Sequence, residues 1–252
     1  MASPPTSPTL PMPRFYCPQA LSIGHTVELP IAVAHHLHVL RMQPGEALTL
    51  FDGRGGQYAA TLAEIGKKRA CATVLGFEDV DVELPWAVTL AQGLPEGTKM
   101  DWIIEKAVEL GVAAIQPLAA ARSVVKLSAE RAEKRQAHWQ GVIVAASEQS
   151  GRNRLAQLAA PSDFRRYIAA PAGQPRILFT PRAAQSLAAW AQATGPQALT
   201  VLVGPEGGFS AEEEAAALAA GAVALSLGPR VLRTETAGLA ALAALGALWG
   251  GM

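Results

Sequence analysis

The sequence predicts an α/β protein in two parts, a small N-terminal β-barrel followed by a larger α/β domain with a mainly parallel sheet. Two patterns predict it. Up to residue 84, short strand patterns are separated by turn-forming residues, and from Pro85 onward continuous apolar strands alternate with helical patterns. The chain has 252 residues, of which 50% are hydrophobic and 17% charged, so it can bury a substantial core and is not a disordered chain.

Residues 1–13 are predicted to be a disordered leader, because they contain five prolines among Ser and Thr and no apolar run typical of a signal peptide. The apolar stretch at residues 237–252 is short for a membrane span. The two cysteines, Cys17 and Cys71, are too few for a disulfide framework or a four-cysteine zinc site. We therefore expect a cytoplasmic protein that does not associate with membranes.

Residues 14–84 are predicted to form the barrel, since closure of the sheet removes the exposed edges of many short strands. Asp52-Gly53 between two apolar runs is a hairpin signal. A short helix is expected at residues 31–41. The predicted strands are residues 14–17, 26–29, 47–51, 57–62 and 70–75.

Residues 85–252 are predicted to form the α/β domain. Residues 199–203 are continuously apolar, as in a parallel strand that is buried on both faces. Ser210 is a typical helix cap, and three glutamates follow it in the first turn. The other predicted strands are residues 87–90, 114–118, 177–179 and 222–227, and the other helices are residues 99–110, 128–149, 183–193 and a last one that begins at Thr234 or Thr236.

The strongest candidate site is the glycine-rich segment at residues 203–210, which follows a buried strand and precedes the Ser210 cap. Ligands of open α/β sheets bind at the carboxyl ends of strands, and glycines allow the backbone to approach a ligand closely. The segment matches neither a Walker loop nor a dinucleotide-binding fingerprint. The alternative is an ordinary strand-to-helix turn with a capping serine.

A second candidate is the segment at residues 225–237, in which Arg230, Arg233, Glu235 and two threonines crowd a loop beside an apolar helix. Polar groups that are half-buried there need partners, which a ligand, a second subunit or the residues themselves could supply. The alternative is that Thr236 is only a helix cap and both arginines are solvated.

The formal net charge is zero, which excludes bulk electrostatic binding of nucleic acid. Residues 122–154 are nevertheless locally basic, and two basic loops there could bracket a phosphate-bearing substrate, although such a run is usually a solvated face. The basic residues are Arg122, Lys126, Arg131, Lys134, Arg135, Arg152 and Arg154, against the acids Glu130, Glu133 and Glu148. His35, His36 and His38 lack Cys or acidic partners at metal-ligand spacing, so no metal is expected.

Eight blocks of the sequence, spread from Arg14 nearly to the C-terminus, match one known family in order and spacing: residues 14–15, 36–41, 52–53, 105–112, 122–126, 148–152, 204–210 and 227–237. The chain thereby resembles the RsmE-type methyltransferases of the SPOUT class, which methylate N3 of a uridine in 16S ribosomal RNA. The resemblance implies a PUA-like barrel for RNA binding, a SPOUT domain with a C-terminal trefoil knot, and a homodimer. It also implies S-adenosylmethionine as the cofactor.

The resemblance places the cofactor against three segments of the chain. The implied cofactor-binding residues are Phe179, Thr180, Val203, Gly204, Pro205, Glu206, Gly207, Gly208, Leu227, Gly228, Val231, Leu232 and Arg233. In-line methyl transfer needs alignment and no metal, but the uracil N3 proton must leave. We expect Arg233 to stabilise developing negative charge and Glu206 or Glu235 to accept the proton, unless Arg233 and Glu235 only pair with each other.

The substrate implied by the resemblance is 16S ribosomal RNA, either free or within the 30S subunit. The predicted RNA-contact residues are Arg14, His38, Arg41, Arg122, Lys126, Arg152 and Arg154. Two alternatives remain. Related SPOUT enzymes act on transfer RNA or on ribose 2′-hydroxyls, and a non-catalytic assembly factor could keep the barrel and a degenerate α/β domain.

Overall fold

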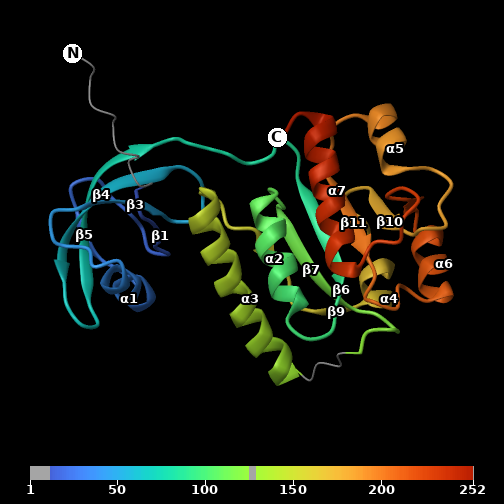
Figure 1. The fold of residues 1–252 in the computed structure, drawn as a ribbon, viewed down its shortest axis with the longest axis horizontal. Coiled ribbons are helices and arrows are strands. Elements are labelled where there is room, and N and C mark those ends of the chain that lie inside the picture. The colour runs from blue at the N-terminus through green and yellow to red at the C-terminus, as the bar shows by residue number, and fades with distance from the viewer. Residues whose placement is uncertain (1–11, 125–128, 252) are drawn as a thin grey trace, which may run out of the picture. The chain divides into compact units, whose positions relative to one another are not determined.

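The computed structural model describes residues 12–124 and 129–251, which form two compact units (Figure 1). The N-terminal unit contains the chain up to Val82 together with Gly151–Arg154, and the C-terminal unit contains Glu83–Ser150 and the chain from Leu155 onward. Apart from Met12 and Pro13, the predicted leader lies outside the described residues. The inclusion of residues 151–154 in the N-terminal unit was not predicted.

The N-terminal unit contains a five-stranded sheet in the order β1-β3-β4-β5-β2, in which β1 is parallel to β3 and the other neighbours are antiparallel. Its elements are β1 (Arg14–Tyr16), β2 (Thr26–Glu28), α1 (Ile31–Val39), β3 (Ala47–Phe51), β4 (Gln57–Ile65) and β5 (Ala70–Glu78). The five predicted strands and the helix are confirmed, with β4 and β5 longer than predicted. Leu48, Leu50 and Leu62 of the sheet pack against Leu37 of α1 in one core.

Residues 151–154 are held in the N-terminal unit by a set of polar contacts. The Asn153 side chain accepts a hydrogen bond from Arg14 Nη2 (2.7 Å) and donates one to the Val80 carbonyl (2.9 Å). Arg154 Nη1 donates to the Arg54 carbonyl (2.6 Å), and its Nε lies 3.0 Å from an Asp81 carboxylate oxygen. Asn153 is 1% exposed. The segment is therefore a structural part of the N-terminal unit.

These contacts bear on three of the predicted RNA-contact residues. Arg152 is only 4% exposed, so its side chain is not presented to a phosphate. Arg14 donates to Gln57 Oε1 (2.6 Å) as well as to Asn153, and Arg154 is paired with Asp81. Because a guanidinium that is bonded inside the protein has fewer donors left for RNA, these contacts support a structural role for the three arginines. The Arg154 side chain is still 52% exposed, and contact of these residues with RNA stays a prediction.

Asn153→Ala tests this role. The substitution removes two partly buried hydrogen bonds, one to the Val80 carbonyl and one from Arg14, and a typical hydrogen bond contributes about 0.5–1.5 kcal/mol. We expect the free energy of unfolding in urea to fall by about that amount. Lys68→Ala, on an exposed turn, is the control and should change it by less than about 0.5 kcal/mol. Equal values for the two variants would contradict the structural role.

The C-terminal unit is built on a parallel sheet in the order β12-β10-β11-β6-β7-β8, with β9 also paired to β7. The parallel sheet predicted from the continuous apolar strands is confirmed. The strands are β6 (Val88–Gly93), β7 (Ala114–Ala119), β8 (Gln157–Leu158), β9 (Ser162–Asp163), β10 (Arg176–Phe179), β11 (Leu199–Val203) and β12 (Val223–Leu225).

Helices cover both faces of this sheet (Figure 1). Val201 and Val203 of β11 point to the core formed with α2, α3, α5 and α7, whereas Leu202 points to the core formed with α4 and α6. This alternation follows from the two-residue period of a strand. The helices are α2 (Lys99–Glu109), α3 (Ala129–Ser150), α4 (Phe164–Ala169), α5 (Leu187–Thr194), α6 (Ala211–Ala219) and α7 (Thr234–Trp249).

The structure differs from the predicted elements at two places, and it decides between the two starts that were expected for the last helix. The sequence did not predict β8, β9 or α4, because elements this short show no periodicity. The helix expected at residues 183–193 begins only at Leu187, since Ser186 is its cap and the Gln185 carbonyl accepts a hydrogen bond from the Ser226 amide (2.9 Å). The last helix begins at Thr234 with Arg233 as the preceding residue, so Thr236 is not its cap.

None of the helices within residues 12–124 and 129–251 is long and apolar enough to cross a membrane.

Candidate functional site

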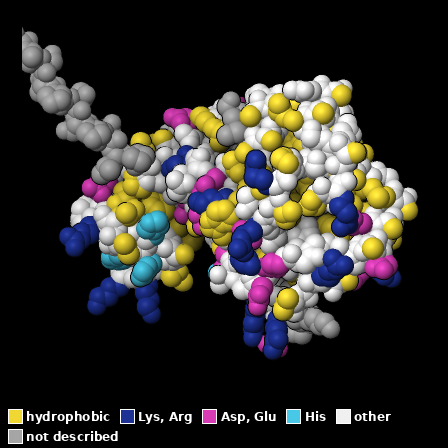
Figure 2. Space-filling view, turned by 45° about the vertical axis from the view of Figure 1, so that its right-hand side comes forward, with side chains coloured by type: hydrophobic (Ala, Val, Ile, Leu, Met, Phe, Trp, Pro, Cys, Tyr) yellow, Lys and Arg dark blue, Asp and Glu magenta, His cyan; other side chains and the backbone are white. Residues whose placement is uncertain are grey.

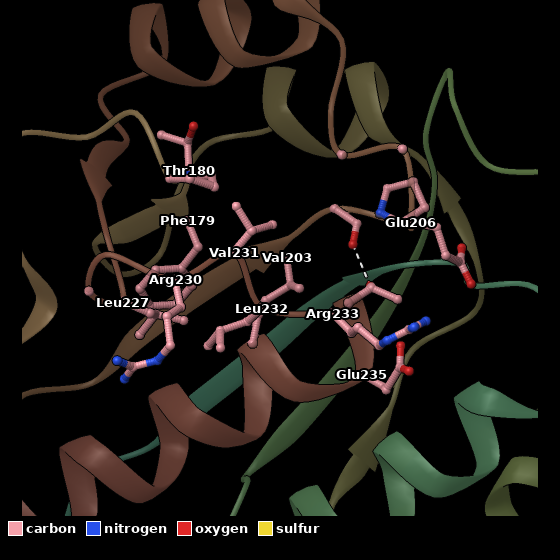
Figure 3. Close-up of a pocket in the computed structure, with 18 residues that line it drawn as sticks. Phe179, Thr180, Val203, Glu206, Leu227, Arg230, Val231, Leu232, Arg233 and Glu235 are labelled. Atoms are coloured by element: carbon pink, nitrogen blue, oxygen red, sulfur yellow. Dashed lines mark hydrogen bonds between the residues drawn. The ribbon is translucent and has the colours of Figure 1, made fainter.

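A cavity of about 410 Å³ lies at the carboxyl ends of β10, β11 and β12 (Figure 3). Its walls are the turn after β10, the glycine-rich loop after β11 and the segment that joins β12 to α7. The structure brings together on these walls every residue predicted for cofactor binding. The remaining lining residues are Pro181, Arg230, Thr234, Glu235 and Ala237. Of these, Pro181 lies outside both candidate segments, whereas the other four belong to the candidate segment at residues 225–237.

The glycine-rich loop is folded tightly against itself and against β6. A Cβ atom on Gly204 would lie 2.9 Å from backbone atoms of Gly208 and Phe209, and one on Gly93 would lie 2.6 Å from the backbone nitrogen of Pro205. Gly208 has a φ of +67°, which favours glycine. The loop therefore needs small residues on both sides of the contact. Gly93 does not line the cavity but packs against the loop that forms its wall, and the sequence motif did not indicate it.

A buried chain of hydrogen bonds joins this loop to β6 and α7. Gln92 Nε2 donates to Thr234 Oγ1 (2.9 Å), and Thr234 Oγ1 donates to the Gly204 carbonyl (2.5 Å; Figure 3). Gln92 is fully buried and Thr234 is 7% exposed. These two hydrogen bonds fix the Gly204 carbonyl and with it the position of the cavity wall. They start from β6, a strand that the sequence analysis did not connect with the site.

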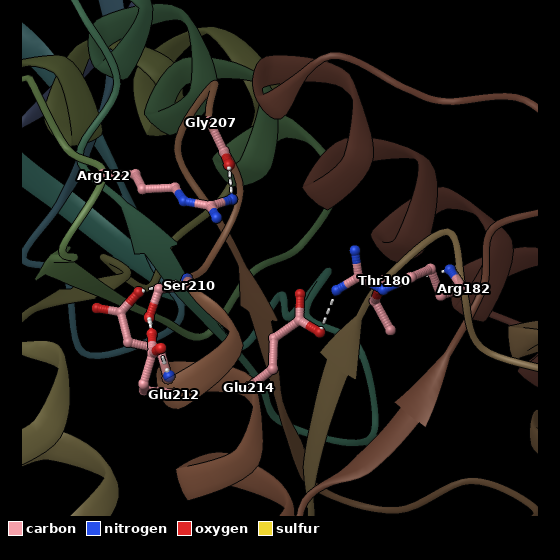
Figure 4. A network of polar contacts seen from close by, with 8 residues as sticks. Arg122, Thr180, Arg182, Gly207, Ser210, Glu212 and Glu214 are labelled. Atoms are coloured by element: carbon pink, nitrogen blue, oxygen red, sulfur yellow. Dashed lines mark hydrogen bonds and ion pairs between the residues drawn. The ribbon is translucent and has the colours of Figure 1, made fainter.

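Two further contacts fix the other side of the loop, and Figure 4 shows one of them, between Arg122 and Gly207. Ser210 and Glu213 form the predicted helix cap of α6 as a reciprocal capping box. The buried Glu213 carboxylate also accepts a hydrogen bond from the Ala121 amide (2.7 Å), and Arg122 Nη1 donates to the Gly207 carbonyl (2.8 Å). The turn at residues 120–123 is thereby attached to the glycine-rich loop.

Arg122, a predicted RNA contact, is exposed and shares its guanidinium with this loop carbonyl. Lys126, its predicted partner in RNA binding, lies outside the described residues. His38 and Arg41 are exposed at α1 and just after it, and His38 Nε2 lies 2.5 Å from the Gly66 carbonyl. Figure 2 shows histidine and basic side chains gathered on the surface of the N-terminal unit.

Glu206, one of the two candidate proton acceptors, is engaged in other contacts. Its Oε1 accepts hydrogen bonds from Lys99 Nζ (2.5 Å) and from the Glu96 amide (3.1 Å). Partial burial raises the pKa of Glu206, but the hydrogen bonds from Lys99 and from backbone amides outweigh that effect and leave the pKa below its ordinary value. A carboxylate that is stabilised in this way is a weaker proton acceptor.

Arg233 and Glu235 lie toward one end of the cavity and Arg230 toward the other (Figure 3). Within the described chain, Arg233 and Glu235 form no ion pair or hydrogen bond with each other, so the alternative that they only pair to hold the loop is not seen. Arg233 is exposed and Glu235 is half-buried. Both side chains are therefore available to a ligand. No group of three or more metal-ligating side chains occurs in the part of the chain that the structure describes.

Comparison with known proteins adds to this geometry. One family model, an RNA methyltransferase domain, matches residues 82–246, and a second, an RNA methyltransferase PUA domain, matches residues 32–75. The ribosomal RNA small subunit methyltransferase E of Synechocystis is 36% identical over 231 residues, which are 90% of this chain and 74% of that protein. The Bacillus subtilis protein of the same name is 32% identical over 84% of this chain and 86% of its own length.

Solved structures of methyltransferases are also similar to this chain over most of its length. The ribosomal RNA small subunit methyltransferase E of Neisseria gonorrhoeae, bound to S-adenosyl methionine, has a TM-score of 0.87 at 42% identity and covers 94% of this chain and 98% of that one. A Legionella pneumophila protein in complex with the same cofactor has a TM-score of 0.89 at 34% identity, with the same coverage.

The fold, the cavity and these matches define an RNA methyltransferase with a PUA-like domain. Within that class, the chain belongs to the ribosomal RNA small subunit methyltransferase E family. The resemblance to RsmE-type enzymes drawn from the sequence motifs is confirmed.

Proposed function

We propose that this protein transfers a methyl group from S-adenosylmethionine to N3 of a uridine in 16S ribosomal RNA. The observation that carries the proposal is the cavity at the carboxyl ends of β10, β11 and β12, which gathers all thirteen residues that the family resemblance assigns to the cofactor. Its volume of about 410 Å³ lies in the range of sites for cofactors and small ligands, about 300–1,000 Å³.

The chemistry of the cavity walls fits this cofactor. Phe179, Leu227 and Leu232 supply apolar surface for an adenine ring, and the tightly packed backbone of the glycine-rich loop can approach the ribose and the amino-acid part closely. When bound, the cofactor supplies an electrophilic methyl group on a sulfonium centre. The loops align the reacting atoms and exclude water, which is the main contribution an enzyme makes to an in-line displacement.

Glu235 is our choice for the residue that accepts the N3 proton. It lines the cavity and is half-buried, and it makes no hydrogen bond or ion pair with another described side chain. Glu206 accepts hydrogen bonds from Lys99 and the Glu96 amide, which lower its basicity. Loss of the proton leaves negative charge on the uracil ring, and Arg233, on the same wall, stabilises that charge.

Arg233→Ala tests the second role. Removing one group that stabilises developing charge lowers kcat by about 10²–10³-fold in enzymes that depend on such a group. We expect a loss of that order in methylation under saturating cofactor, measured by transfer of a radiolabelled methyl group to RNA, with the protein still folded. Arg230→Ala, at the other end of the cavity, is the matched control. Full methylation by Arg233→Ala would exclude the role.

We further propose that the N-terminal unit is a PUA-like barrel that positions RNA through His38 and Arg41. Arg122 contacts RNA beside the glycine-rich loop, and Lys126, of the same basic sequence segment, is a further RNA contact. The match of residues 32–75 to an RNA methyltransferase PUA domain supports the first part. The proposed target lies in the 30S subunit, in the cytoplasm. Charge reversal at Arg41, by Arg41→Glu, should weaken RNA binding and reduce its salt dependence, since fewer counterions are then released.

The trefoil knot and the homodimer are also part of this proposal. After β12, Ser226 is hydrogen-bonded to Gln185 and Leu187, and the chain then returns to Thr234, which is bonded to Gly204 after β11. Because the segment after β12 passes the loop that follows β10 before it reaches Gly204, this path supports a knotted C-terminus.

The sequence of α7 supports the homodimer. No charged residue follows Glu235 in the sequence, and an Ala- and Leu-rich helix such as α7 suits a subunit interface.

Calorimetric titration with S-adenosylmethionine tests the enzyme against a non-catalytic assembly factor. We expect saturable binding with one site per chain, and an absence of binding would favour the assembly factor. The titration needs no RNA, so it examines the cavity independently of the proposed target.

A further inference from the structure

A second cavity, of about 430 Å³, lies in the C-terminal unit and is lined by Thr98, Lys99, Trp102 and Glu235. Glu235 lines this cavity and the first one. The two spaces therefore meet at the residue that we propose as the proton acceptor. None of the residues on α2 that line the second cavity was singled out by the sequence motifs.

Trp102 is the unusual feature of this cavity. The other apolar residues of α2, such as Met100, Ile103 and Ile104, are buried in the core, whereas Trp102 is 46% exposed. Trp86 and Trp139 are buried, and Trp190 and Trp249 are half-buried. An indole that is left in water beside a cavity is a surface on which a flat ring can stack.

Charged groups flank the indole. Lys99 donates a hydrogen bond to Glu206, and this contact raises the pKa of Lys99. The negative charge of the nearby Glu235 raises that pKa further, so the Lys99 ammonium stays charged. Glu235 supplies an acceptor on the wall shared with the first cavity. A ligand that fits this set has a flat ring, oxygen atoms that accept from an ammonium, and an N–H that a carboxylate can take.

We propose that the second cavity holds a base of the RNA strand to be methylated, stacked on the Trp102 indole with its oxygens toward Lys99 and its N–H edge toward Glu235. The inference rests on the proposed function and names the place of the substrate. Glu235 lines both cavities, so a base in the second cavity lies next to the cofactor cavity. The methyl donor and the methyl acceptor then occupy adjoining spaces. Trp102 and Lys99 are then substrate-binding residues.

A second copy of the chain is the other occupant that such a surface could have. The neighbours of Trp102 on the same helix argue against it, because Lys106 forms ion pairs with Glu105 and Glu109 at the surface. Charged residues are depleted in the cores of protein interfaces, and a single indole among them suits a nucleobase better than a subunit contact.

Tryptophan fluorescence tests the proposal directly, because Trp102 is the most exposed of the five indoles. The protein is saturated with S-adenosylhomocysteine and titrated with a single-stranded oligouridine. We expect quenching of the wild-type protein and of Trp190→Phe, the matched control, and loss of most of that quenching in Trp102→Phe. Trp102→Ala should raise KM for RNA by about 5- to 150-fold, the effect of losing one stacking contact.

Three results would overturn the inference. Quenching that persists in Trp102→Phe would place the base elsewhere, and an unchanged KM for RNA in Trp102→Ala would show that the indole does not bind substrate. A halved mass of Trp102→Ala in light scattering would assign the surface to a second copy. Cofactor titration of the wild-type protein separates this inference from the proposed function, since lost cofactor binding there would contradict the function itself.

Discussion

Replacing Glu235 by Gln should lower kcat for RNA methylation by about 10²–10⁴-fold, the contribution that a positioned general base makes. The amide has nearly the shape of the carboxylate but cannot take the N3 proton. Because Glu235 makes no hydrogen bond to another described residue, its replacement should leave the fold and the dissociation constant of S-adenosylmethionine nearly unchanged. The measurement is single-turnover methyl transfer at saturating cofactor, with calorimetry on the same preparation.

Glu206→Gln is the matched comparison for this variant. Glu206 lines the same cavity, but its carboxylate is already bonded to Lys99 and to the Glu96 amide. The expected loss in kcat is less than tenfold, because the substitution removes a partly exposed ion pair rather than the proton acceptor. If Glu206→Gln lost more activity than Glu235→Gln, the two assignments would have to be exchanged.

Gly93→Ala should weaken cofactor binding by about 5- to 150-fold, although Gly93 lies outside the glycine-rich motif. The added methyl would stand 2.6 Å from the Pro205 nitrogen and 3.0 Å from the Gly204 carbonyl carbon. These are backbone atoms, so the loop that walls the cavity has to move, and overpacking of this kind costs about 1–3 kcal/mol. The dissociation constant is measured by calorimetry.

Gly141→Ala is the control for this substitution. Gly141 lies within α3, and an added Cβ there would meet no atom within 4 Å apart from its chain neighbours and the backbone of its own helix. Alanine is the better helix former by about 1 kcal/mol, so stability should stay equal or rise and cofactor binding should not change. A Gly93→Ala protein that binds the cofactor as the wild type does would show that the contact with Pro205 does not shape the cavity.

The strands and the main loops of the site could be predicted because their signals are local. Val203, the loop glycines and Ser210 all lie within the one stretch of residues 203–210, and each restricts the backbone by its own chemistry. The same holds for the segment that begins at Leu227. Local signals also account for the helices α2 and α6, where apolar spacing or a capping box is contained in one stretch of sequence.

The contacts that complete the site could not be predicted, because their partners are far apart in the chain. Gln92 and Thr234 are separated by 142 positions, and Lys99 and Glu206 by 107. From the sequence, Arg152 and Arg154 predict a basic loop. Only the fold shows that Asn153 and Arg154 are hydrogen-bonded to residues of the N-terminal unit. Charge in a sequence does not tell whether an arginine faces water or a carbonyl.

The most direct test of the central claim is the position of the methyl group in the product. Unmodified 30S subunits and free 16S RNA are incubated with the protein and deuterated S-adenosylmethionine, and the digested RNA is analysed by mass spectrometry. We predict labelled 3-methyluridine at a single position of 16S RNA. Label on a ribose 2′-hydroxyl or in transfer RNA, or no labelled nucleoside from a protein that binds the cofactor, would contradict the account.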